Sequence, residues 1–415
     1  MEKPYEWAGG AVLEEHSKQK HKILREYFFN YLNVRCQIPQ QERFRLAVVD
    51  GFSGGGRYLC GTAGSPVIFI EELKHAIQTV NTQRALHNLA PIEIECLLIF
   101  NDASPDAINL LKQNVSPVLA EARETEPKLH IQVEYLNLPF ESAYPQIKDF
   151  LVRGRYKNVL FNLDQCGYSR VERATLLDIM HSYQAEIFYT FAIQSLLAFL
   201  AKTNAALLQS QLKFLGLDST DLSDLEKMMS NQAWLGIAER LVFEAFRDCS
   251  AFLSPFSINN PGGWRYWLIH FARSYRARQV YNNILHNNSS AQAHFGRSGL
   301  NMLAYDPSHA GGSLYLFDDV GRNEAVDQLH DDIPRLITDS GDAMLVSSFY
   351  ENIYNSTAAH AEDIHKAIIN SPDLQVVTAT GGIRRKANTI AVTDVIKLKN
   401  QISFFPMFFD TTKKK

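Results

Sequence analysis

The stretch Val48-Val49-Asp50-Gly51-Phe52-Ser53-Gly54-Gly55-Gly56-Arg57 decides the fold of this chain. It joins a short apolar run to an acidic residue and then to a turn that contains four glycines. Glycine adopts positive φ and lets the backbone approach a ligand closely. This order is therefore typical of a buried strand that carries a ligand-binding turn to the edge of a sheet.

Further apolar runs of strand length follow this one, and helical patterns separate them. The five predicted strands cover 46–50, 94–100, 131–136, 158–163 and 186–191. Strands that alternate with helices form βαβ units, and right-handed crossovers bring the carboxyl ends of the strands to one edge. The sequence therefore predicts an α/β fold with a Rossmann-like, doubly wound sheet, and ligands bind such sheets at that edge.

The remaining patterns divide the chain into four segments. We expect an N-terminal helical segment at 1–43, a Rossmann-like domain at 44–290 with a helical insertion near 203–250, a loop or linker at 291–324, and a C-terminal domain at 325–412. In the last segment three helical patterns precede two strands that are joined across Gly381-Gly382. This order predicts a mainly helical C-terminal region that contains a winged helix.

The composition is that of a globular protein, with 46% hydrophobic residues, 21% charged residues and a formal net charge of −4. A surface for a polyanion would therefore have to be a local patch. The five cysteines lack CxxC spacing, which disfavours a disulfide framework and fits a reducing compartment. No run approaches the roughly 20 apolar residues that span a bilayer. We expect a cytoplasmic protein without a membrane segment, and no histidine spacing indicates a metal site.

Acidic residues follow the first two predicted strands, as Asp50 and Asp102. An acid just before the glycines can hold the ammonium of a methionine moiety, whereas a dinucleotide fingerprint begins with glycine at that turn. Asp102 can accept both hydroxyls of a ribose, although it can also cap the helix that follows. The predicted cofactor is S-adenosylmethionine (SAM). The residues expected to bind it are Asp50, Gly51, Phe52, Gly54, Gly56, Asp102 and Asn137.

Polar residues also follow the fourth predicted strand, in the stretch 162–168. Asp164 can orient an acceptor N–H or O–H, and Tyr168 can stack on a flipped or single-stranded base. The alternative is a turn that Asp164 and Gly167 stabilise. Methyl transfer mainly requires alignment of the acceptor with the sulfonium methyl group, so a catalytic triad is not needed. We expect Asp164 and Tyr168 to be the catalytic residues.

Basic residues gather in a predicted helix after position 272 and in the turn between the last two strands. The residues expected to contact DNA or RNA are Arg273, Arg276, Arg278, Arg384, Arg385 and Lys386. A basic helix is more often a solvated face, so this helix alone is weak evidence for nucleic acid. The charged residues of the predicted first helix, including Lys20 and His21, are likewise expected to be solvated.

Several of these motifs together resemble the three-Cys-motif partner family (TcmP). The matching residues are Trp7, the Lys20-His21, Leu24 and Tyr27 pattern, the Asp50 glycine turn, Gly64-Ser65-Pro66, Asn101-Asp102, the stretch 164–168 and the run 266–271. The resemblance covers most of 7–290 and implies a class I SAM methyltransferase-like fold. It also implies bacterial defence against mobile elements and a protein partner with three cysteines that resembles radical-SAM proteins.

The chain departs from the family pattern at two places. Gln165 and Cys166 stand where the family has Pro and Phe, which removes a rigid proline from the predicted acceptor pocket. Ser53 and Gly55 replace Ala and Pro in the glycine turn. The expected function is SAM-dependent methylation of nucleic acid. The alternative is a catalytically inactive SAM- or nucleotide-binding scaffold, and the missing GxGxxG register disfavours a dinucleotide-dependent oxidoreductase.

Overall fold

The computed structural model describes residues 6–193, 195–196, 213–216, 242–259, 265–288, 292–295, 299–300, 314–316 and 319–399. The chain divides into two compact units. The first unit comprises Met1–Gly296 and Tyr305–Asp318, and the second comprises Arg297–Ala304 and Asp319–Lys415. Most of the insertion expected near 203–250 lies outside the described residues.

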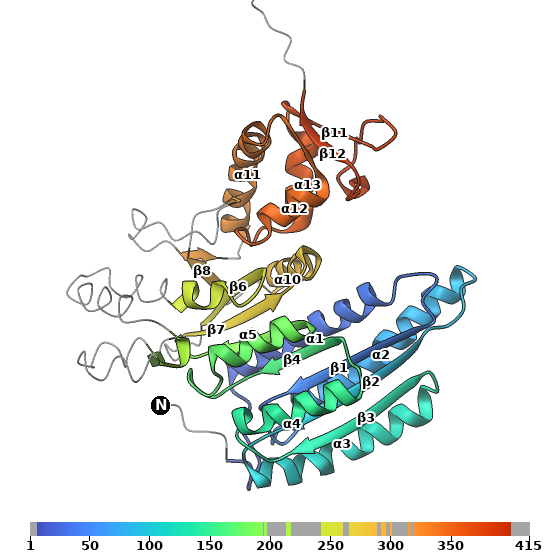
Figure 1. Cartoon of the computed structure of the whole chain (residues 1–415), viewed down its shortest axis with the longest axis vertical. Coiled ribbons are helices and arrows are strands. Elements are labelled where there is room, and N and C mark those ends of the chain that lie inside the picture. The colour runs from blue at the N-terminus through green and yellow to red at the C-terminus, as the bar shows by residue number, and fades with distance from the viewer. Residues whose placement is uncertain are drawn as a thin grey trace, which may run out of the picture. The chain divides into compact units, whose positions relative to one another are not determined.

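The first unit is built on a sheet in the order β3-β2-β1-β4-β5-β7-β6-β8-β9 (Figure 1). Its parallel strands are β1 (Arg43–Asp50), β2 (Glu93–Asn101), β3 (Leu129–Leu136), β4 (Asn158–Leu163) and β5 (Gln184–Phe191). These confirm the five predicted strands. Its antiparallel strands are β6 (Phe252–Asn259), β7 (Arg265–Ala272), β8 (Gln292–Phe295) and β9 (Leu314–Leu316).

The place of β7 distinguishes this sheet from a dinucleotide-binding one. The dinucleotide fold runs 3-2-1-4-5-6, whereas here β7 lies between β5 and β6 and is antiparallel to both. A reversed strand at that place is the arrangement of the class I methyltransferase fold. The predicted fold class is therefore confirmed.

Helices cover both faces of the sheet (Figure 1). On one face α1 (Glu15–Arg35) packs against α2 (Ser65–Leu86) and α10 (Tyr275–Asn287), and α2 packs against α3 (Pro105–Thr125). The other face carries α4 (Phe140–Arg153) and α5 (Arg173–Ser182). Because both faces are covered, the strands are buried almost continuously, and the last five residues of β1 are all buried.

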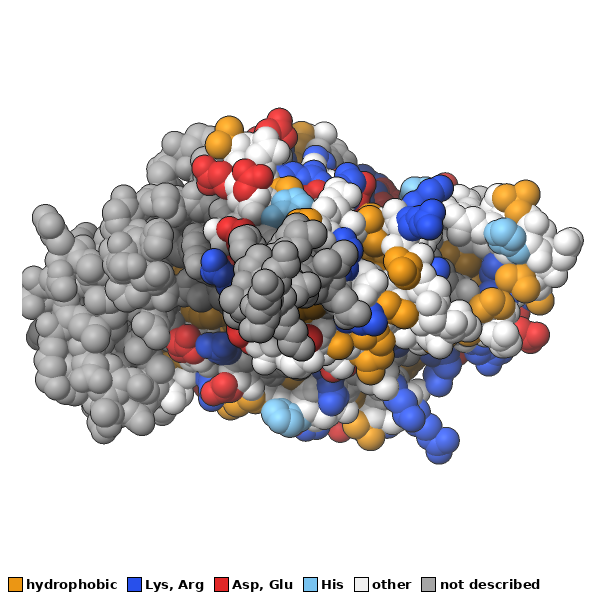
Figure 2. Space-filling model, turned by 90° about the horizontal axis from the view of Figure 1, so that it is seen from above, with side chains coloured by type: hydrophobic (Ala, Val, Ile, Leu, Met, Phe, Trp, Pro, Cys, Tyr) orange, Lys and Arg blue, Asp and Glu red, His pale blue; other side chains and the backbone are white. Residues whose placement is uncertain are grey.

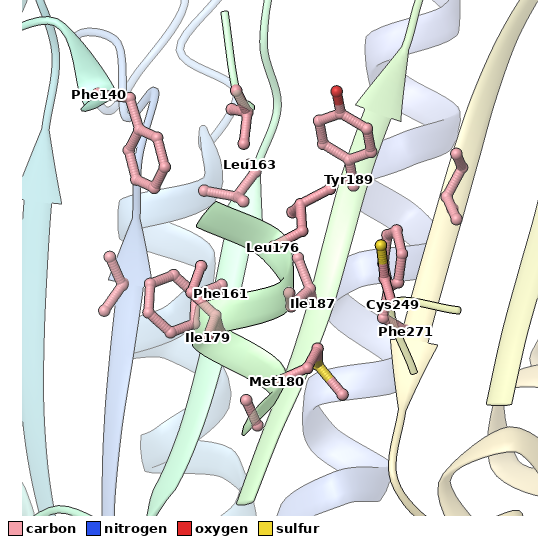
Figure 3. Close-up of a cluster of buried hydrophobic side chains, with 14 of the residues drawn as sticks. Phe140, Phe161, Leu163, Leu176, Ile179, Met180, Ile187, Tyr189, Cys249 and Phe271 are labelled. Atoms are coloured by element: carbon pink, nitrogen blue, oxygen red, sulfur yellow. The ribbon is translucent and has the colours of Figure 1, made fainter. Parts of the chain in front are cut away.

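The core beneath α4 and α5 fixes the carboxyl ends of the strands. Phe161, Ile187 and Phe271 of the sheet meet Phe140 of α4 and Ile179 of α5 in one apolar cluster (Figure 3). Each of these side chains is at most 2% exposed. Burial of such a side chain contributes roughly 1.5–3 kcal/mol. The turns that follow β1 and β4 therefore rest on a rigid base.

Two segments differ from the sequence-based expectation. The linker expected at 291–324 contains β8 and β9, which extend the sheet. Strand β6 includes Pro255, although a proline disfavours a strand interior because it has no N–H to donate. On one side, Pro255 pairs with β7. On the other side, β6 pairs with β8 at positions 257–258, which do not include Pro255. A proline is tolerated there because its missing N–H faces no second partner strand.

The second unit has winged-helix order. Its elements are α11 (Asp319–Asp339), β10 (Ala343–Leu345), α12 (Val346–Ile353), α13 (Ala361–Asn370), β11 (Leu374–Val377) and β12 (Val395–Leu398). The three strands form an antiparallel sheet in the order β10-β12-β11. Leu329, Phe349, Ile364 and Ile396 form its core and are fully buried. The sequence predicted the last strand at 389–392, but β12 begins at Val395. The wing, defined here as residues 378–394, is therefore longer than predicted. No described helix has the length and apolarity that a membrane crossing requires.

Candidate cofactor and acceptor site

A cavity of about 550 Å³ lies at the carboxyl edge of the parallel strands. The turns after β1, β2 and β4 and the end of β5 form its floor, and the first two turns of α1 close one side. Its volume falls within the roughly 300–1,000 Å³ of small-molecule sites. The cavity therefore lies where open α/β sheets bind their ligands.

The glycine turn after β1 is anchored to the end of β2. The Ser53 amide donates to the Asn101 carbonyl at 2.9 Å, and the Gly54 amide donates to Asp102 Oδ2 at 3.0 Å. Gly54 has a φ of 57°, which disfavours any residue with a side chain. A Cβ at Gly54 would also collide with the indole of Trp7, which lines the cavity. Trp7 therefore covers the turn.

Asp102 lines the cavity and holds two neighbouring segments. Besides the Gly54 amide it accepts the Ser104 amide, on Oδ1 at 2.8 Å. Ser104 in turn is the N-cap of α3, because its hydroxyl accepts from the Ala107 amide at 3.3 Å. Each carboxylate oxygen keeps a second lone pair, so these contacts leave acceptor capacity for ribose hydroxyls. Burial raises the pKa of Asp102.

Three predicted cofactor residues lie outside the cavity wall. The Asn137 amide group donates to the Asp102 carbonyl at 2.8 Å and so supports the wall from behind. Gly51 packs against Phe140 and Leu163 of the core. Asp50 is fully buried beneath the cavity wall, and other residues form the wall itself. Direct contact of these three residues with the cavity is not seen.

The environment of Asp50 is unusual for a carboxylate. Asn162 Nδ2 donates to its Oδ1 at 3.1 Å, and its Oδ2 has no hydrogen-bond partner among the described residues. Burial raises the pKa of Asp50 to about 7, and the polar groups of Asn162 and Ser65 beside it offset this only in part. Asp50 is therefore a titratable group directly under the cavity.

An ion pair joins α1 to the turn after β4. Lys20 Nζ donates to both carboxylate oxygens of Asp164, at 2.5 and 2.8 Å. The Lys20 side chain is 9% exposed and that of Asp164 is 25% exposed. Burial would raise the pKa of Asp164, but the charge and the hydrogen bonds of Lys20 hold it below its usual value. The predicted catalytic residue is thus a fixed, ionised carboxylate in the cavity wall.

Two histidines of α1 lie beside this ion pair, where the sequence indicated a solvated helix face. His16 and Lys20 are four residues apart and share a helix face, His21 follows Lys20 directly, and all three line the cavity. The His16 ring stacks on Tyr266 of β7, with centroids 4.4 Å apart and an interplanar angle of 9°. Burial lowers the pKa of each histidine to about 4. Both imidazoles are therefore neutral at neutral pH.

The segment after Asp164 differs from its predicted role. Tyr168 is not among the wall residues, and its ring lies 6.3 Å from Phe191 and 5.8 Å from Phe214 at the edge of the core. Gln165 and Cys166 do line the cavity. Gln165 Nε2 donates to the Tyr189 hydroxyl at 2.7 Å, and its Oε1 accepts the Arg170 amide at 2.8 Å. These two bonds fix the turn without the family's proline.

Three basic residues predicted to contact nucleic acid lie at 273–278: Arg273 just before α10 and Arg276 on α10 are exposed, whereas Arg278 is not. Arg278 is fully buried, which contradicts its predicted contact with nucleic acid. Arg273 donates to the Tyr183 carbonyl at 3.0 Å, and Arg276 donates to Gln279 at 2.5 Å. On the face drawn in Figure 2, basic and acidic side chains are interspersed.

In the second unit, the wing carries exposed basic side chains. Arg384 is engaged by Asp394 in a bidentate ion pair of 2.8 and 3.2 Å, whereas Arg385 and Lys386 are exposed. On α13 the exposed Lys366 is paired with Glu362 at 2.8 Å. The segment 319–399 as a whole contains twelve acidic and eight basic residues. The wing therefore offers cationic contacts to a nucleic acid.

The fold and the cavity define an α/β protein with a Rossmann-like sheet and a winged-helix unit. A family model described as the GMT-like wHTH domain matches residues 304–381, which include α11 to β11. No curated protein matches the chain. The C-terminal unit is therefore similar to the GMT-like winged helix-turn-helix domains, and such a domain is consistent with nucleic-acid binding.

Proposed function

We propose that this chain is a SAM-dependent methyltransferase that acts on nucleic acid. The observation that carries the proposal is the cavity itself. It places Asp102, the glycine turn and the Asp164 carboxylate around one hollow, at the carboxyl edge of a sheet with the class I strand order. The corresponding edge of a parallel sheet is the general ligand site of this architecture.

The charge of the wall supports a sulfonium cofactor over a dinucleotide. The described wall residues include five carboxylates, on Glu6, Glu14, Asp102, Asp106 and Asp164. They include two permanent cations, Lys20 and Arg170. Excess negative charge attracts the ammonium and sulfonium groups of SAM and repels a pyrophosphate. The residues present therefore fit SAM, which when bound supplies an activated methyl group.

Different residues of the chain would bind the cofactor, orient the acceptor and contact the nucleic acid. Asp102 and the backbone of Gly54 would hold the adenosine end, and Phe52 would give that end an apolar surface. Asp164 would orient the acceptor, because a carboxylate with a lowered pKa is a strong hydrogen-bond acceptor but a weak base. Asp50, once ionised, would add negative charge beneath the methionine end. Arg385 and Lys386 of the wing would contact phosphates.

The biological setting is proposed from the family resemblance alone. By that resemblance, the protein acts in bacterial defence against mobile elements, together with a three-cysteine partner protein. Co-purification of the partner encoded beside this chain tests this setting. The enzymatic proposal stands on the cavity and does not depend on the outcome.

Transfer of a tritiated methyl group from SAM to DNA or tRNA tests the activity. We expect incorporation that Asp164→Asn abolishes, because the acceptor would lose its fixed carboxylate. Asp178→Asn is the matched control, since Asp178 also pairs with a lysine, Lys148 at 2.7 Å, but lies on α5 outside the cavity wall. Incorporation that is unaffected by Asp164→Asn contradicts the assigned site.

A scaffold without catalysis is the second candidate, and one observation favours it. Gln165 and Cys166 replace the residues of the family motif beside Asp164, and both line the cavity. Binding of S-adenosylhomocysteine without methyl transfer to DNA, RNA or protein would identify the scaffold. Failure to bind S-adenosylhomocysteine would exclude the methyltransferase and a SAM-binding scaffold.

A further inference from the structure

The end of the cavity beside α1 carries groups that a bound SAM molecule does not require. They are the ion pair of Lys20 and Asp164, the buried His21, and the stacked rings of His16 and Tyr266. They come from α1, β7 and the turn after β4, three elements that the fold brings together at one place. Their chemistry defines what this end of the cavity can bind.

Asp164 offers a hydrogen-bond acceptor in a fixed orientation. Lys20 contacts both of its oxygens, so the carboxylate cannot rotate without breaking a bond. One quarter of the Asp164 side chain remains exposed, and the residue lines the cavity. An ionised carboxylate accepts hydrogen bonds only, so its partner in the ligand must be an N–H or O–H.

His21 adds a group without a partner of its own. It is 91% buried and borders the cavity, and its Nδ1 has no hydrogen-bond partner among the described residues. A buried polar atom of this kind costs free energy unless a ligand or water satisfies it. A neutral imidazole beside a carboxylate can pair with a ligand edge that alternates donors and acceptors. The polar edge of a nucleobase has this character.

The stacked pair of His16 and Tyr266 provides a flat wall. Its rings are nearly parallel, at 9°. Aromatic rings stack on the face of any planar base. The predicted stacking residue Tyr168 packs against the core instead, so this wall is the aromatic surface that the cavity offers beside Asp164.

Phosphate does not suit this end of the cavity. The charge of Lys20 is neutralised by Asp164, and both histidines are neutral because burial lowers the pKa of each. Of the described wall residues, Arg170 is then the remaining permanent cation, against four further carboxylates. A nucleotide would therefore enter with its base and leave its phosphate outside.

We propose that this end of the cavity is the acceptor subsite and binds the uncharged edge of a single extruded nucleobase. Asp164 and His21 hydrogen-bond to the edge, His16 stacks on the ring with Tyr266 behind it, and Lys20 is a positioning residue that fixes Asp164. Extrusion of the base from a duplex, or a single-stranded substrate, is the usual way to bring a base into such a pocket. The inference rests on the proposed function and names its substrate class.

Binding of nucleosides to the full chain tests the subsite. The chain is first saturated with S-adenosylhomocysteine, so that the probes cannot occupy the cofactor end. Adenosine, cytidine, guanosine and thymidine are then titrated by calorimetry, each beside its 5′-monophosphate. We expect at least one nucleoside to bind, and its monophosphate to bind no more tightly.

Variants assign the binding to the named residues. Asp164→Asn is expected to weaken nucleoside binding about tenfold or more, since a charge-assisted hydrogen bond is lost. Asp178→Asn is the control. Because Asp164→Asn leaves Lys20 unpaired, the double variant Lys20→Met/Asp164→Asn repeats the test in a fold without that charge. His16→Ala is expected to weaken binding roughly fivefold or more, and His16→Phe to retain it.

The outcomes separate this inference from the proposed function. If S-adenosylhomocysteine binds but no nucleoside does, the subsite is overturned and the cofactor site stands. A monophosphate that binds tenfold more tightly than its nucleoside, or a lysine peptide that binds in place of all four nucleosides, also overturns it. If S-adenosylhomocysteine itself fails to bind, the proposed function falls.

Discussion

Two carboxylates of this protein differ because their surroundings differ. Asp164 is paired with Lys20, which lowers its pKa, whereas Asp50 is fully buried, and this burial together with the charge of Asp164 raises its pKa to about 7. The first is therefore ionised at neutral pH, and the second is half protonated there. This difference supports the proposal that Asp164 is the hydrogen-bond acceptor that orients the substrate.

Asp50 makes stability depend on pH. An unfolded Asp ionises near pH 3.9, so between about pH 4 and pH 7 the folded state holds a proton that the unfolded state has released. The contribution of Asp50 to stability therefore falls as pH rises through this window. We expect Asp50→Asn to gain stability relative to the wild type by roughly 2–3 kcal/mol between pH 5 and pH 8.

Urea unfolding of the wild type and of Asp50→Asn, each at pH 5 and pH 8, measures this difference in stability. Comparison of the variant with the wild type cancels the other titrating groups. An equal difference in unfolding free energy at pH 5 and pH 8 would mean that Asp50 titrates normally.

Removal of one partner of the Lys20–Asp164 ion pair should destabilise the fold. Lys20→Met leaves a mostly buried carboxylate without its partner, and we expect a loss of about 3 kcal/mol, the lower end of the range for buried pairs. The double variant Lys20→Met/Asp164→Asn should recover most of it. Thermal unfolding measures both, and a double variant as unstable as the single one would contradict the coupling.

At the scale of elements, the glycine turn after β1 is the most constrained segment. Gly54 has positive φ and faces Trp7, whereas Gly61 has positive φ with nothing within 4 Å of its Cβ position. We expect Gly54→Ala to weaken S-adenosylhomocysteine binding at least about tenfold, because the turn must shift away from Trp7 and Asp102. Gly61→Ala carries the same backbone strain and should leave binding unchanged.

Calorimetry of the two alanine variants decides the point. Equal losses in both would show that general strain, rather than the position of this turn, controls binding.

The elements that sequence predicted best are those whose signal is local. The five parallel strands follow from the periodicity of apolar residues. The pair of Lys20 and Asp164 spans 144 positions, and no local pattern reports a contact at that distance. Helical spacing alone would have placed His16 and Lys20 on one face, but it would not have shown that this face is buried or that His21 also borders the cavity. Arg278 was misplaced for the same reason.

At the scale of the whole molecule, the two units carry different surfaces. The first unit contains a cavity with excess negative charge, and the second offers exposed cations on its wing. The recognition helix of a winged helix normally enters the groove, but the exposed Lys366 of α13 is paired with Glu362. The wing is therefore expected to supply most of the electrostatic attraction to nucleic acid.

Salt-dependent binding of a DNA duplex tests the wing. We expect Arg385→Ala and Lys386→Ala each to weaken binding and to reduce the slope of log K against log salt by about 1. Lys366→Ala should have a smaller effect, because its charge is already paired. Fluorescence anisotropy measures all three, and a larger loss from Lys366→Ala would assign the contact to α13.

The most direct test of the cofactor site is a crystal structure of the full chain with S-adenosylhomocysteine. The account predicts density in the cavity, with the ribose hydroxyls on Asp102, the adenosine end along Phe52 and Gly54, and the sulfur facing the side of Asp164. Density in another place, or a ligand whose ribose does not contact Asp102, would contradict it.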